Sequence, residues 1–237
     1  MPNFDPLFAT GQFKALVIGS NGALGRAFVE AFQSEPNCSH VEAVSRSAGS
    51  GFDLQDAESI CAQAAWTSEK GPFEIIIDAT GALVINGIGP EKSLQSVDSE
   101  HLMQSFLVNA IGPALVLRHF SQLLSPGASI YAKLSARVGS ISDNQKGGWY
   151  GYRASKAALN MVLQTAALEL QRKNKLLRVV ALQPGTVKSK LSQPFVGSQN
   201  HILEPHESVE GMLRALRNLS TKSGAHFIDY KGNEIPW

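Results

Sequence analysis

Tyr152 and Lys156 are the residues of this chain whose types and spacing indicate chemistry most directly. They stand four positions apart in a segment of helical period, so both side chains would share one face of a helix. A tyrosine ordinarily titrates near pH ~10, and a neighbouring ammonium group favours its ionised form. Such a tyrosine can give and take a proton near neutral pH. The same spacing is common on ordinary helices, so the pair gains meaning only from the rest of the chain.

A glycine-rich turn is predicted after the first strand, and it leads directly into a helix. It reads Gly19-Ser20-Asn21-Gly22-Ala23-Leu24-Gly25. Glycines allow a tight turn and a close approach of the backbone, and the start of a helix favours a pyrophosphate group. The position between a strand and a helix predicts a dinucleotide cofactor. Its ligands in this turn would be Gly19, Asn21, Gly22, Ala23, Leu24 and Gly25.

Apolar stretches of strand length alternate with segments of helical period. Strands are predicted at residues 14–18, 41–45, 73–77, 129–134, 179–183 and 225–229, and helices at 24–33, 58–65, about 100–124, 152–172 and 209–219. This alternation indicates parallel strands joined by right-handed crossovers. The predicted fold class is α/β, a three-layer doubly wound parallel sheet (Rossmann fold). One domain spanning residues 1–237 is expected, with a substrate lid at about residues 186–205.

The composition restricts the partners. Of the 237 residues 43% are hydrophobic, and the net charge is +1 without a basic run. That balance argues against nucleic acid and against an anionic membrane as partners. Cys38 and Cys61 lack metal-ligand spacing, so neither a metal site nor a disulfide framework is expected. The chain shows no signal peptide and no membrane-spanning apolar run, so a cytoplasmic protein is predicted.

Together, the glycine turn, Tyr152 and Lys156 resemble the short-chain dehydrogenase/reductase family, from about residue 14 to residue 237. The resemblance implies that Asn109 holds a water molecule that relays protons towards Lys156. It also implies that the Asp53 side chain and the Leu54 N–H group recognise adenine, and that Gly81 keeps the backbone path past the cofactor. The nicotinamide carboxamide would meet the segment after the sixth strand of the family, through Pro184, Gly185, Val187 and Ser189.

The end of the second predicted strand bears on the choice between the two nicotinamide cofactors. In this fold an acidic residue there accepts the ribose 2′-OH of NAD(H), whereas a basic residue pairs with the 2′-phosphate of NADP(H). The chain carries Arg46 and no carboxylate at this point. NADP(H) is therefore favoured over NAD(H), although Arg46 could instead be a solvated charge of the loop.

The chain departs from the family pattern at the catalytic serine. If Gly139 sets the register, that position holds Ala136, and Ser135 lies one residue earlier. A regular strand would point Ser135 away from the site, whereas a bulge would bring it in. Otherwise Tyr152 alone holds the substrate oxygen. The candidate catalytic residues are Tyr152, Lys156, Asn109 and Ser135.

A second departure lies in the fourth-strand signature of the family. Relatives commonly carry Asn-Asn-Ala-Gly there, whereas this chain reads Asp78-Ala79-Thr80-Gly81. Segments 135–160 and 227–237 look like the C-factor subgroup, relatives of a bacterial cell-to-cell signalling protein.

The resemblance implies an NAD(P)-dependent oxidoreductase, similar to carbonyl reductases, that acts on a small-molecule carbonyl or alcohol. Tyr152 would be the acid/base, and a mostly apolar substrate pocket would include Ile85, Val138 and Trp149. The alternative is a dinucleotide-binding signalling or regulatory protein with weak or no turnover. Ala136 favours this alternative, whereas the intact set of Tyr152, Lys156 and Asn109 opposes it.

By the same resemblance, a homodimer or homotetramer is expected through the helices that contain Asn109 and Tyr152. Apolar residues at helical spacing suit either a partner helix or the core of the protein. They are Val116, Phe120, Leu163 and Ala167.

Overall fold

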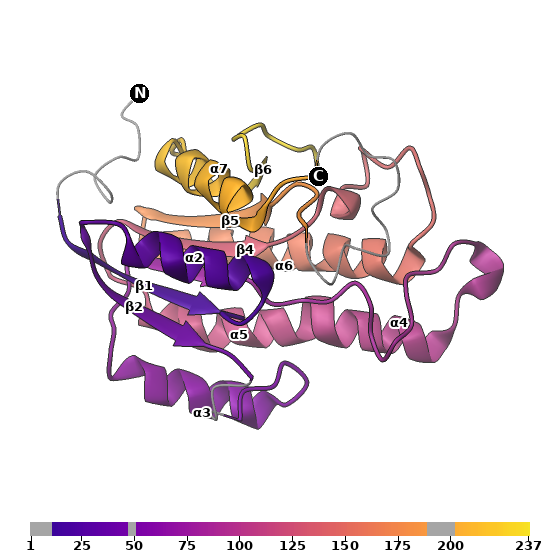
Figure 1. Cartoon of the computed structure of the whole chain (residues 1–237), viewed down its shortest axis with the longest axis horizontal. Helices are drawn as coiled ribbons and strands as arrows, with labels where there is room; N and C mark the ends of the chain where they lie inside the picture. Colours follow the sequence, from indigo (N-terminus) through magenta and orange to yellow (C-terminus); the bar gives the residue numbers. More distant parts are fainter. Residues whose placement is uncertain (1–10, 47–50, 189–201) are drawn as a thin grey trace.

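The structure, a computed structural model, describes residues 11–46, 51–188 and 202–237 (Figure 1). Six parallel strands form one sheet in the order β2-β1-β3-β4-β5-β6. Their bounds are Phe13–Ile18 (β1), Cys38–Val44 (β2), Ile75–Asp78 (β3), Ser129–Leu134 (β4), Leu177–Gln183 (β5) and His226–Asp229 (β6). The chain runs from β1 outward to β2 and then returns to the other side of β1, so the strand order reverses there. In such sheets ligands bind at the carboxyl ends of the strands next to this reversal.

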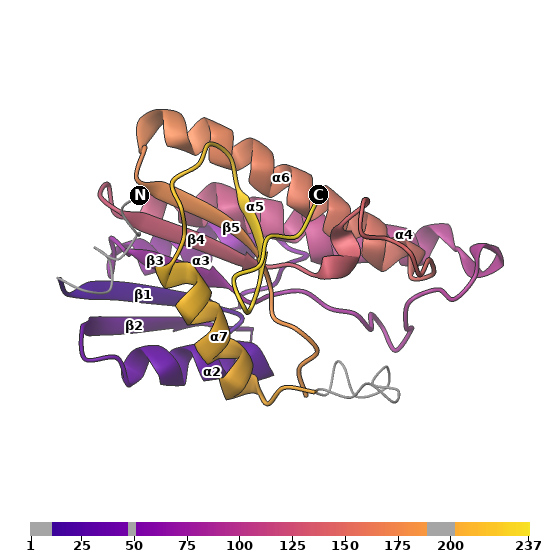
Figure 2. The same ribbon diagram turned by 90° about the horizontal axis from the view of Figure 1, so that it is seen from above.

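Helices cover both faces of the sheet, as Figures 1 and 2 show. Helices α2 (Ala23–Gln33) and α7 (Pro205–Arg217) lie on one face. The opposite face carries α3 (Ala57–Ser68), α5 (Gly112–Phe120) and α6 (Tyr150–Lys173), and α4 (Ser99–Phe106) packs against α6. The predicted three-layer doubly wound fold and its six strands are confirmed.

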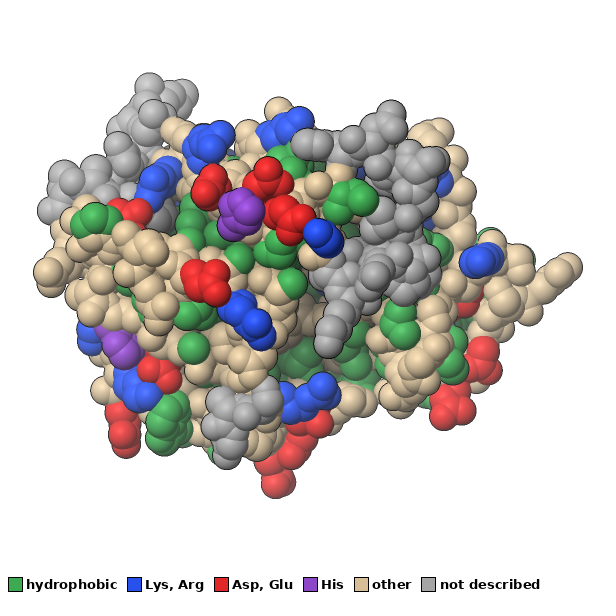
Figure 3. All heavy atoms as spheres, viewed as in Figure 1, with side chains coloured by type: hydrophobic (Ala, Val, Ile, Leu, Met, Phe, Trp, Pro, Cys, Tyr) green, Lys and Arg blue, Asp and Glu red, His purple; other side chains and the backbone are tan. Residues whose placement is uncertain are grey.

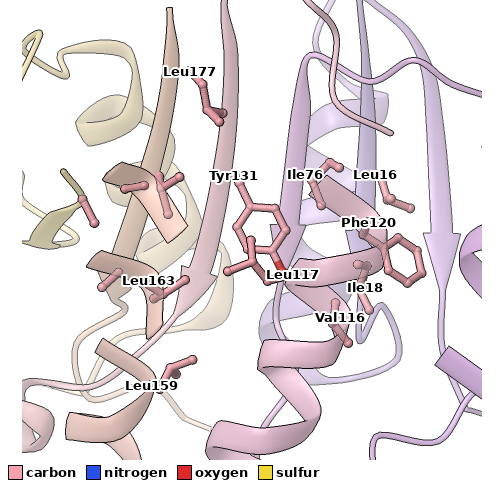
Figure 4. Packing of buried hydrophobic residues seen from close by; sticks show 14 of the residues in the cluster. Leu16, Ile18, Ile76, Val116, Leu117, Phe120, Tyr131, Leu159, Leu163 and Leu177 are labelled. Atoms are coloured by element: carbon pink, nitrogen blue, oxygen red, sulfur yellow. The ribbon is translucent and has the colours of Figure 1, made fainter. Parts of the chain in front are cut away.

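Each face of the sheet has its own apolar core, because the buried strands present hydrophobic residues on both sides. Phe28, Phe32 and Met212 fill the core under α2 and α7. The other core contains Tyr131 of β4, which points between α5 and α6 (Figure 4). Val116, Phe120, Leu163 and Ala167 all belong to this second core and are 0–1% exposed. The alternative that these four residues meet a partner helix is therefore wrong.

The helical stretch predicted over about residues 100–124 is confirmed through α4 and α5, but its hydrogen bonds are not α-helical throughout. A π-helical turn, Leu107–Ile111, separates α4 from α5, and it contains Asn109. The Gly112 N–H group donates to the Leu107 carbonyl oxygen, five residues back. Pro113 follows and has no N–H group, so it cannot supply the hydrogen bond that an α-helix would make to the Asn109 carbonyl. Single π turns of this kind occur frequently at functional sites.

Among the described residues, no helix is both long and apolar enough to cross a membrane.

Candidate active site

The glycine turn joins β1 to α2 at the carboxyl edge of the sheet. Gly19 has φ +83°, in the left-handed region that glycine adopts without strain. A Cβ atom on Gly25 would overlap the Gly19 carbonyl oxygen, so only glycine lets α2 pack this closely on the turn. The N-cap residue of α2 is Gly22, no side chain caps this helix start, and its first turn carries no acidic residue. The positive end of α2 is therefore well suited to a bound anion.

A pocket of about 770 Å³ opens beside this turn. Figure 3 shows a hollow near the middle of this face of the molecule, with hydrophobic side chains at its floor. The predicted cofactor ligands that line the pocket are Asn21, Gly22, Ala23, Leu24, Gly25, Gly81 and Val187. The lining reaches from the helix start to Leu134 at the end of β4. The residues present fit a dinucleotide, because a helix start without acidic residues faces one part of a pocket of suitable volume.

Tyr152 and Lys156 lie one helical turn apart near the start of α6. The Lys156 Nζ atom lies 5.8 Å from the centre of the Tyr152 ring and donates to the Leu134 carbonyl oxygen at 3.3 Å. Burial raises the pKa of Tyr152 to about 12. Burial also lowers the pKa of Lys156 to about 7, the nearby Lys133 ammonium group adds to this effect, and Asp78 opposes it.

The pKa shifts of Tyr152 and Lys156 differ from what the sequence predicts. We expected the Lys156 ammonium to make the Tyr152 phenolate more accessible, yet the pKa of Tyr152 lies above its ordinary value. The reason is that burial disfavours the charged form of both side chains. It also lowers the fraction of Lys156 that is protonated near neutral pH. Tyr152 therefore keeps its proton through the neutral range and is in the state of a proton donor.

Asn109 is fully buried, and its side chain forms hydrogen bonds with both the N–H group and the carbonyl oxygen of Ala82. Its Oδ1 atom accepts from the Ala82 N–H group at 2.9 Å, and its Nδ2 atom donates to the Ala82 carbonyl oxygen at 2.8 Å. Gly81, with φ +125°, lies between Asn109 and Lys156. A Cβ atom on Gly81 would lie 3.1 Å from Asn109 Oδ1 and 3.4 Å from Lys156 Nζ. The fold thus brings Asn109, Gly81 and Lys156 together at the end of β3.

Ser135 continues β4 without a bulge. Its N–H group donates to the Leu182 carbonyl oxygen at 2.9 Å, and the β4–β5 pairing shows no shift of register. Its side chain follows the alternation of Tyr131 and Lys133 and faces α6, where its hydroxyl group donates to Asn160 Oδ1 at 2.6 Å. The bulge that would turn Ser135 into the site is absent from the described strand.

The remaining predicted ligands occupy the ends of other strands. Arg46 is exposed just beyond β2, whose Val44 carbonyl oxygen accepts from the Gly19 N–H group at 2.8 Å. The Asp53 Oδ1 atom accepts from the Gln55 N–H group at 3.0 Å, as in an ordinary turn, and Leu54 packs partly against the core. Whether Asp53 and Leu54 also recognise adenine stays a prediction.

The segment after β5 is described only at its two ends. Pro184 accepts through its carbonyl oxygen from the Ser208 hydroxyl at 2.6 Å, and Gly185 has φ +81°. Backbone hydrogen bonds join residues 186–188 to Leu203. Ser189 and most of the predicted lid lie outside the described residues.

The start of α6 is held in an unusual conformation. Trp149 has φ 56° and ψ 44°, a left-handed conformation that is rare for a bulky residue and is often associated with functional sites. Its N–H group donates to the Glu91 carbonyl oxygen, and the Glu91 carboxylate accepts from the Gly151 N–H group at 3.0 Å. The Trp149 and Tyr152 rings meet edge to face with their centres 6.2 Å apart. Glu91 thus fixes the backbone at Trp149 and at Gly151, the residue directly before Tyr152.

Several residues at the site were not singled out from the sequence. Arg26, Glu30, Ala79, Leu134, Pro205 and His206 also line the pocket. The charged side chains Asp78 and Lys133 form a buried pair beneath the site. Charged residues inside two apolar strands were the sequence signal for this pair.

Comparison with known proteins assigns the chain to a family. The family model described as short chain dehydrogenase matches residues 14–200. A 1-hydroxy-2-glutathionyl-2-methyl-3-butene dehydrogenase of Rhodococcus sp. (strain AD45) is 30% identical over 188 residues, which cover 79% of each chain. C-signal of Myxococcus xanthus is 33% identical over 168 residues, covering 70% of this chain and 94% of that protein. The chain belongs to the short-chain dehydrogenase/reductase family and is an NAD(P)-dependent oxidoreductase.

Solved structures agree with this assignment at the level of the fold. The NADPH-bound carbonyl reductase from chicken fatty liver superposes with a TM-score of 0.83 at 23% identity, covering 98% of this chain and 97% of that one. An NADP-bound short-chain dehydrogenase/reductase from Burkholderia multivorans has a TM-score of 0.78 at 23% identity, covering 95% and 100%. The predicted family and its resemblance to the C-factor subgroup are confirmed.

Proposed function

We propose that this protein is an NADPH-dependent reductase of small carbonyl compounds. The observation that carries the proposal is the placement of Tyr152: it lies one helical turn from Lys156, whose Nζ atom reaches the Leu134 carbonyl oxygen at the carboxyl end of β4, and its raised pKa keeps it protonated. A protonated phenol suits the reduction of a carbonyl, because the product alcohol needs a proton on its oxygen. Intact Tyr152, Lys156 and Asn109 favour this enzyme over the regulatory alternative.

The bound cofactor would supply a hydride from nicotinamide C4 to the carbonyl carbon. The glycine turn and the positive end of α2 would hold the pyrophosphate, with Gly81 and the backbone of Pro184 to Val187 along the nicotinamide half. Tyr152 donates its hydroxyl proton to the carbonyl oxygen, which yields the alcohol. Lys156 then favours the phenolate that remains and orients the ribose, and Asn109 holds the water through which Tyr152 regains a proton.

We infer that Tyr152 is the one side chain that donates a hydrogen bond to the substrate carbonyl oxygen. The support is the Ser135 hydroxyl, whose proton is engaged with Asn160. In comparable sites the loss of one oxyanion donor slows the reaction roughly 100- to 1,000-fold. An enzyme with a single donor would therefore turn over slowly but measurably.

NADPH is the proposed cofactor because Arg46 follows β2 next to the glycine turn. A guanidinium group at this place can pair with the ribose 2′-phosphate. The carbonyl reductase from chicken fatty liver contains NADPH, and the short-chain dehydrogenase/reductase from Burkholderia multivorans contains NADP. Their cofactors support the same choice for this chain.

The proposed substrate is a medium-sized hydrophobic aldehyde or ketone. Trp149 meets the ring of Tyr152, Ile85 is almost fully buried, and Val138 is half-buried. A substrate that binds between these side chains would present its carbonyl oxygen to the Tyr152 hydroxyl group.

A homo-oligomer and a cytoplasmic location complete the proposal. Met161 and Leu168 are 66% and 42% exposed, and they lie seven residues apart on one face of α6. An apolar stripe of this kind suits an isologous contact between two copies. Both cysteines are free thiols, which is compatible with a reducing compartment. Light scattering of wild type and of Met161→Glu tests the assembly.

The direct test of the function is NADPH oxidation against a panel of aldehydes and ketones, with NADH in parallel. We expect turnover with NADPH for at least one hydrophobic carbonyl compound. Tight binding of NADPH without turnover of any member of the panel would contradict the reductase proposal.

A further inference from the structure

Asp78 and Lys133 form an ion pair inside the sheet, under the active site. They are cross-strand partners on β3 and β4, and their side chains face the α5–α6 side. The Lys133 Nζ atom lies 3.0 Å from Asp78 Oδ1, and both side chains are at most 1% exposed. A buried pair is often no more stable than a well-packed apolar pair of similar volume, so stability alone gives weak reason for its presence.

The pair fixes the turn that follows β3. Lys133 Nζ donates to the Thr80 carbonyl oxygen at 2.6 Å and lies 3.0 Å from the Thr80 hydroxyl oxygen. Asp78 Oδ1 accepts from the Thr80 N–H group at 3.0 Å and from the Thr80 hydroxyl. The Tyr131 hydroxyl lies 3.5 Å from Asp78 Oδ2. Thr80 is therefore held through its N–H group, its carbonyl oxygen and its side chain.

This turn is the surface against which the active-site groups lie. Thr80 precedes Gly81, which borders both Asn109 and Lys156, and Ala82 is held by Asn109. Lys133 thus anchors one end of the turn, and Asn109 anchors the other. The Lys133 ammonium group also lies within electrostatic reach of Lys156, whose charged form it disfavours.

We propose that Asp78 and Lys133 are positioning residues of the active site, which fix the Thr80–Ala82 turn against Asn109 and Lys156. The sequence departs from Asn-Asn-Ala-Gly at this place, and Asp78 is the partner that Lys133 requires there. The effect on reduction rests on the proposed function, whereas the effect on Lys156 does not.

Three groups bear on the titration of Lys156. Lys133 on β4 disfavours its charged form, Asp78 on β3 favours it, and Tyr152 on its own helix stays neutral through the neutral range. Of the two opposing charges, Lys133 has the larger effect on the pKa of Lys156. Removing the pair should therefore raise the pKa of Lys156.

The key variant is the double substitution Asp78→Asn with Lys133→Met, because each single change leaves a buried charge without its partner. The Asp78→Asn change keeps an acceptor for the Thr80 N–H group, whereas the Lys133→Met change releases the Thr80 carbonyl oxygen. We expect the double variant to be more stable than either single variant. Lys70→Met is the matched control, since Lys70 pairs with the largely buried Glu42 across a 2.9 Å contact far from the pocket.

The first readout is the NMR titration of Lys156 in protein labelled with ¹³C-lysine and without cofactor, assigned with Lys156→Met. In wild type we expect a midpoint at the Lys156 pKa of about 7. In the double variant the midpoint should move upward, because the Lys133 charge that is lost outweighs the Asp78 charge that is lost with it. The Lys70→Met control should leave it in place, and an unchanged midpoint in the double variant would overturn the proposal.

The second readout is the kinetics of reduction. We expect kcat of the double variant to fall about tenfold through misplacement of the turn, while the alkaline limb of kcat/KM moves to higher pH. Thr80→Val, which removes a hydroxyl group and no charge, should lower kcat without moving the Lys156 midpoint. Wild-type kcat in both variants would contradict the positioning role. A wild type without turnover would contradict the proposed function alone, because the titration needs no turnover.

Discussion

Replacing Gly25 by alanine tests whether the close packing of α2 on the glycine turn supports cofactor binding. The added Cβ would overlap the Gly19 carbonyl oxygen and would lie 2.8 Å from the Gly19 carbonyl carbon and 2.9 Å from Ser20 Cα. All three are backbone atoms, so no side-chain rotation relieves the overlap. Overpacking typically costs about 1–3 kcal/mol, and a backbone clash places this site at about 3 kcal/mol. For a chain of this size that corresponds to a loss of about 6–12 °C in Tm.

The helix start must move to accept the new methyl group, so the N–H groups that face the pocket move with it. We expect NADPH to bind at least about tenfold more weakly, equivalent to about 1.4 kcal/mol. Thermal unfolding and fluorescence titration with NADPH measure the two effects. Gly127→Ala is the control, because a Cβ atom there meets only Ser125 Oγ at 3.8 Å. If Gly25→Ala matched that control in Tm and in NADPH affinity, the packing argument would be refuted.

Three further predictions concern the cofactor, the pH profile and the start of α6. Arg46→Ala should weaken NADPH binding about tenfold and leave NADH unchanged, as expected for loss of one charge-assisted hydrogen bond at an exposed site; equal losses in titrations of both cofactors would contradict this. The kcat/KM of reduction should decline as pH rises through about 7, where Lys156 loses its charge, whereas Tyr152, with its pKa of about 12, stays protonated; a flat profile through neutral pH would argue against the role of Lys156. Glu91→Ala removes the acceptor of the Gly151 N–H group and should lower kcat more than Glu91→Gln does; equal steady-state kcat in both variants would exclude a positioning role for Glu91.

Most of the fold was accessible from the sequence because its signals are local. The strands predicted at residues 14–18 and 129–134, for example, are short apolar runs, and each is followed by a segment of helical period. The six strands and the doubly wound class follow from this alternation. The π-helical turn at Leu107–Ile111 was not predicted, although Gly112 and Pro113 are its visible signal, because the apolar period continues through it.

The candidate site was accessible where spacing along one helix decides proximity. Tyr152 and Lys156 are four residues apart, so one helix places them together. The Asp78–Lys133 pair joins positions 55 residues apart, and it depends on the register between β3 and β4. The rise in the pKa of Tyr152 likewise comes from burial, which arises only when the elements are assembled.

The side of β4 on which the Ser135 side chain lies decides whether this residue can take part in catalysis, and a shift by one residue would reverse it. Alternation along β4 places Ser135 on the same face as Tyr131 and Lys133, where Asn160 accepts its hydroxyl proton. The sequence left a bulge open as an alternative, and only the backbone pairing with Leu182 excludes it.

Tyr152→Phe tests the central claim most directly, since it removes one hydroxyl group and keeps the ring that meets Trp149. NADPH affinity and carbonyl reduction should be measured on wild type and variant side by side. We predict that NADPH binding persists while reduction falls by at least about 100-fold, within the range of general acid catalysis. Reduction at the wild-type rate in Tyr152→Phe would contradict the assignment of Tyr152 as the proton donor.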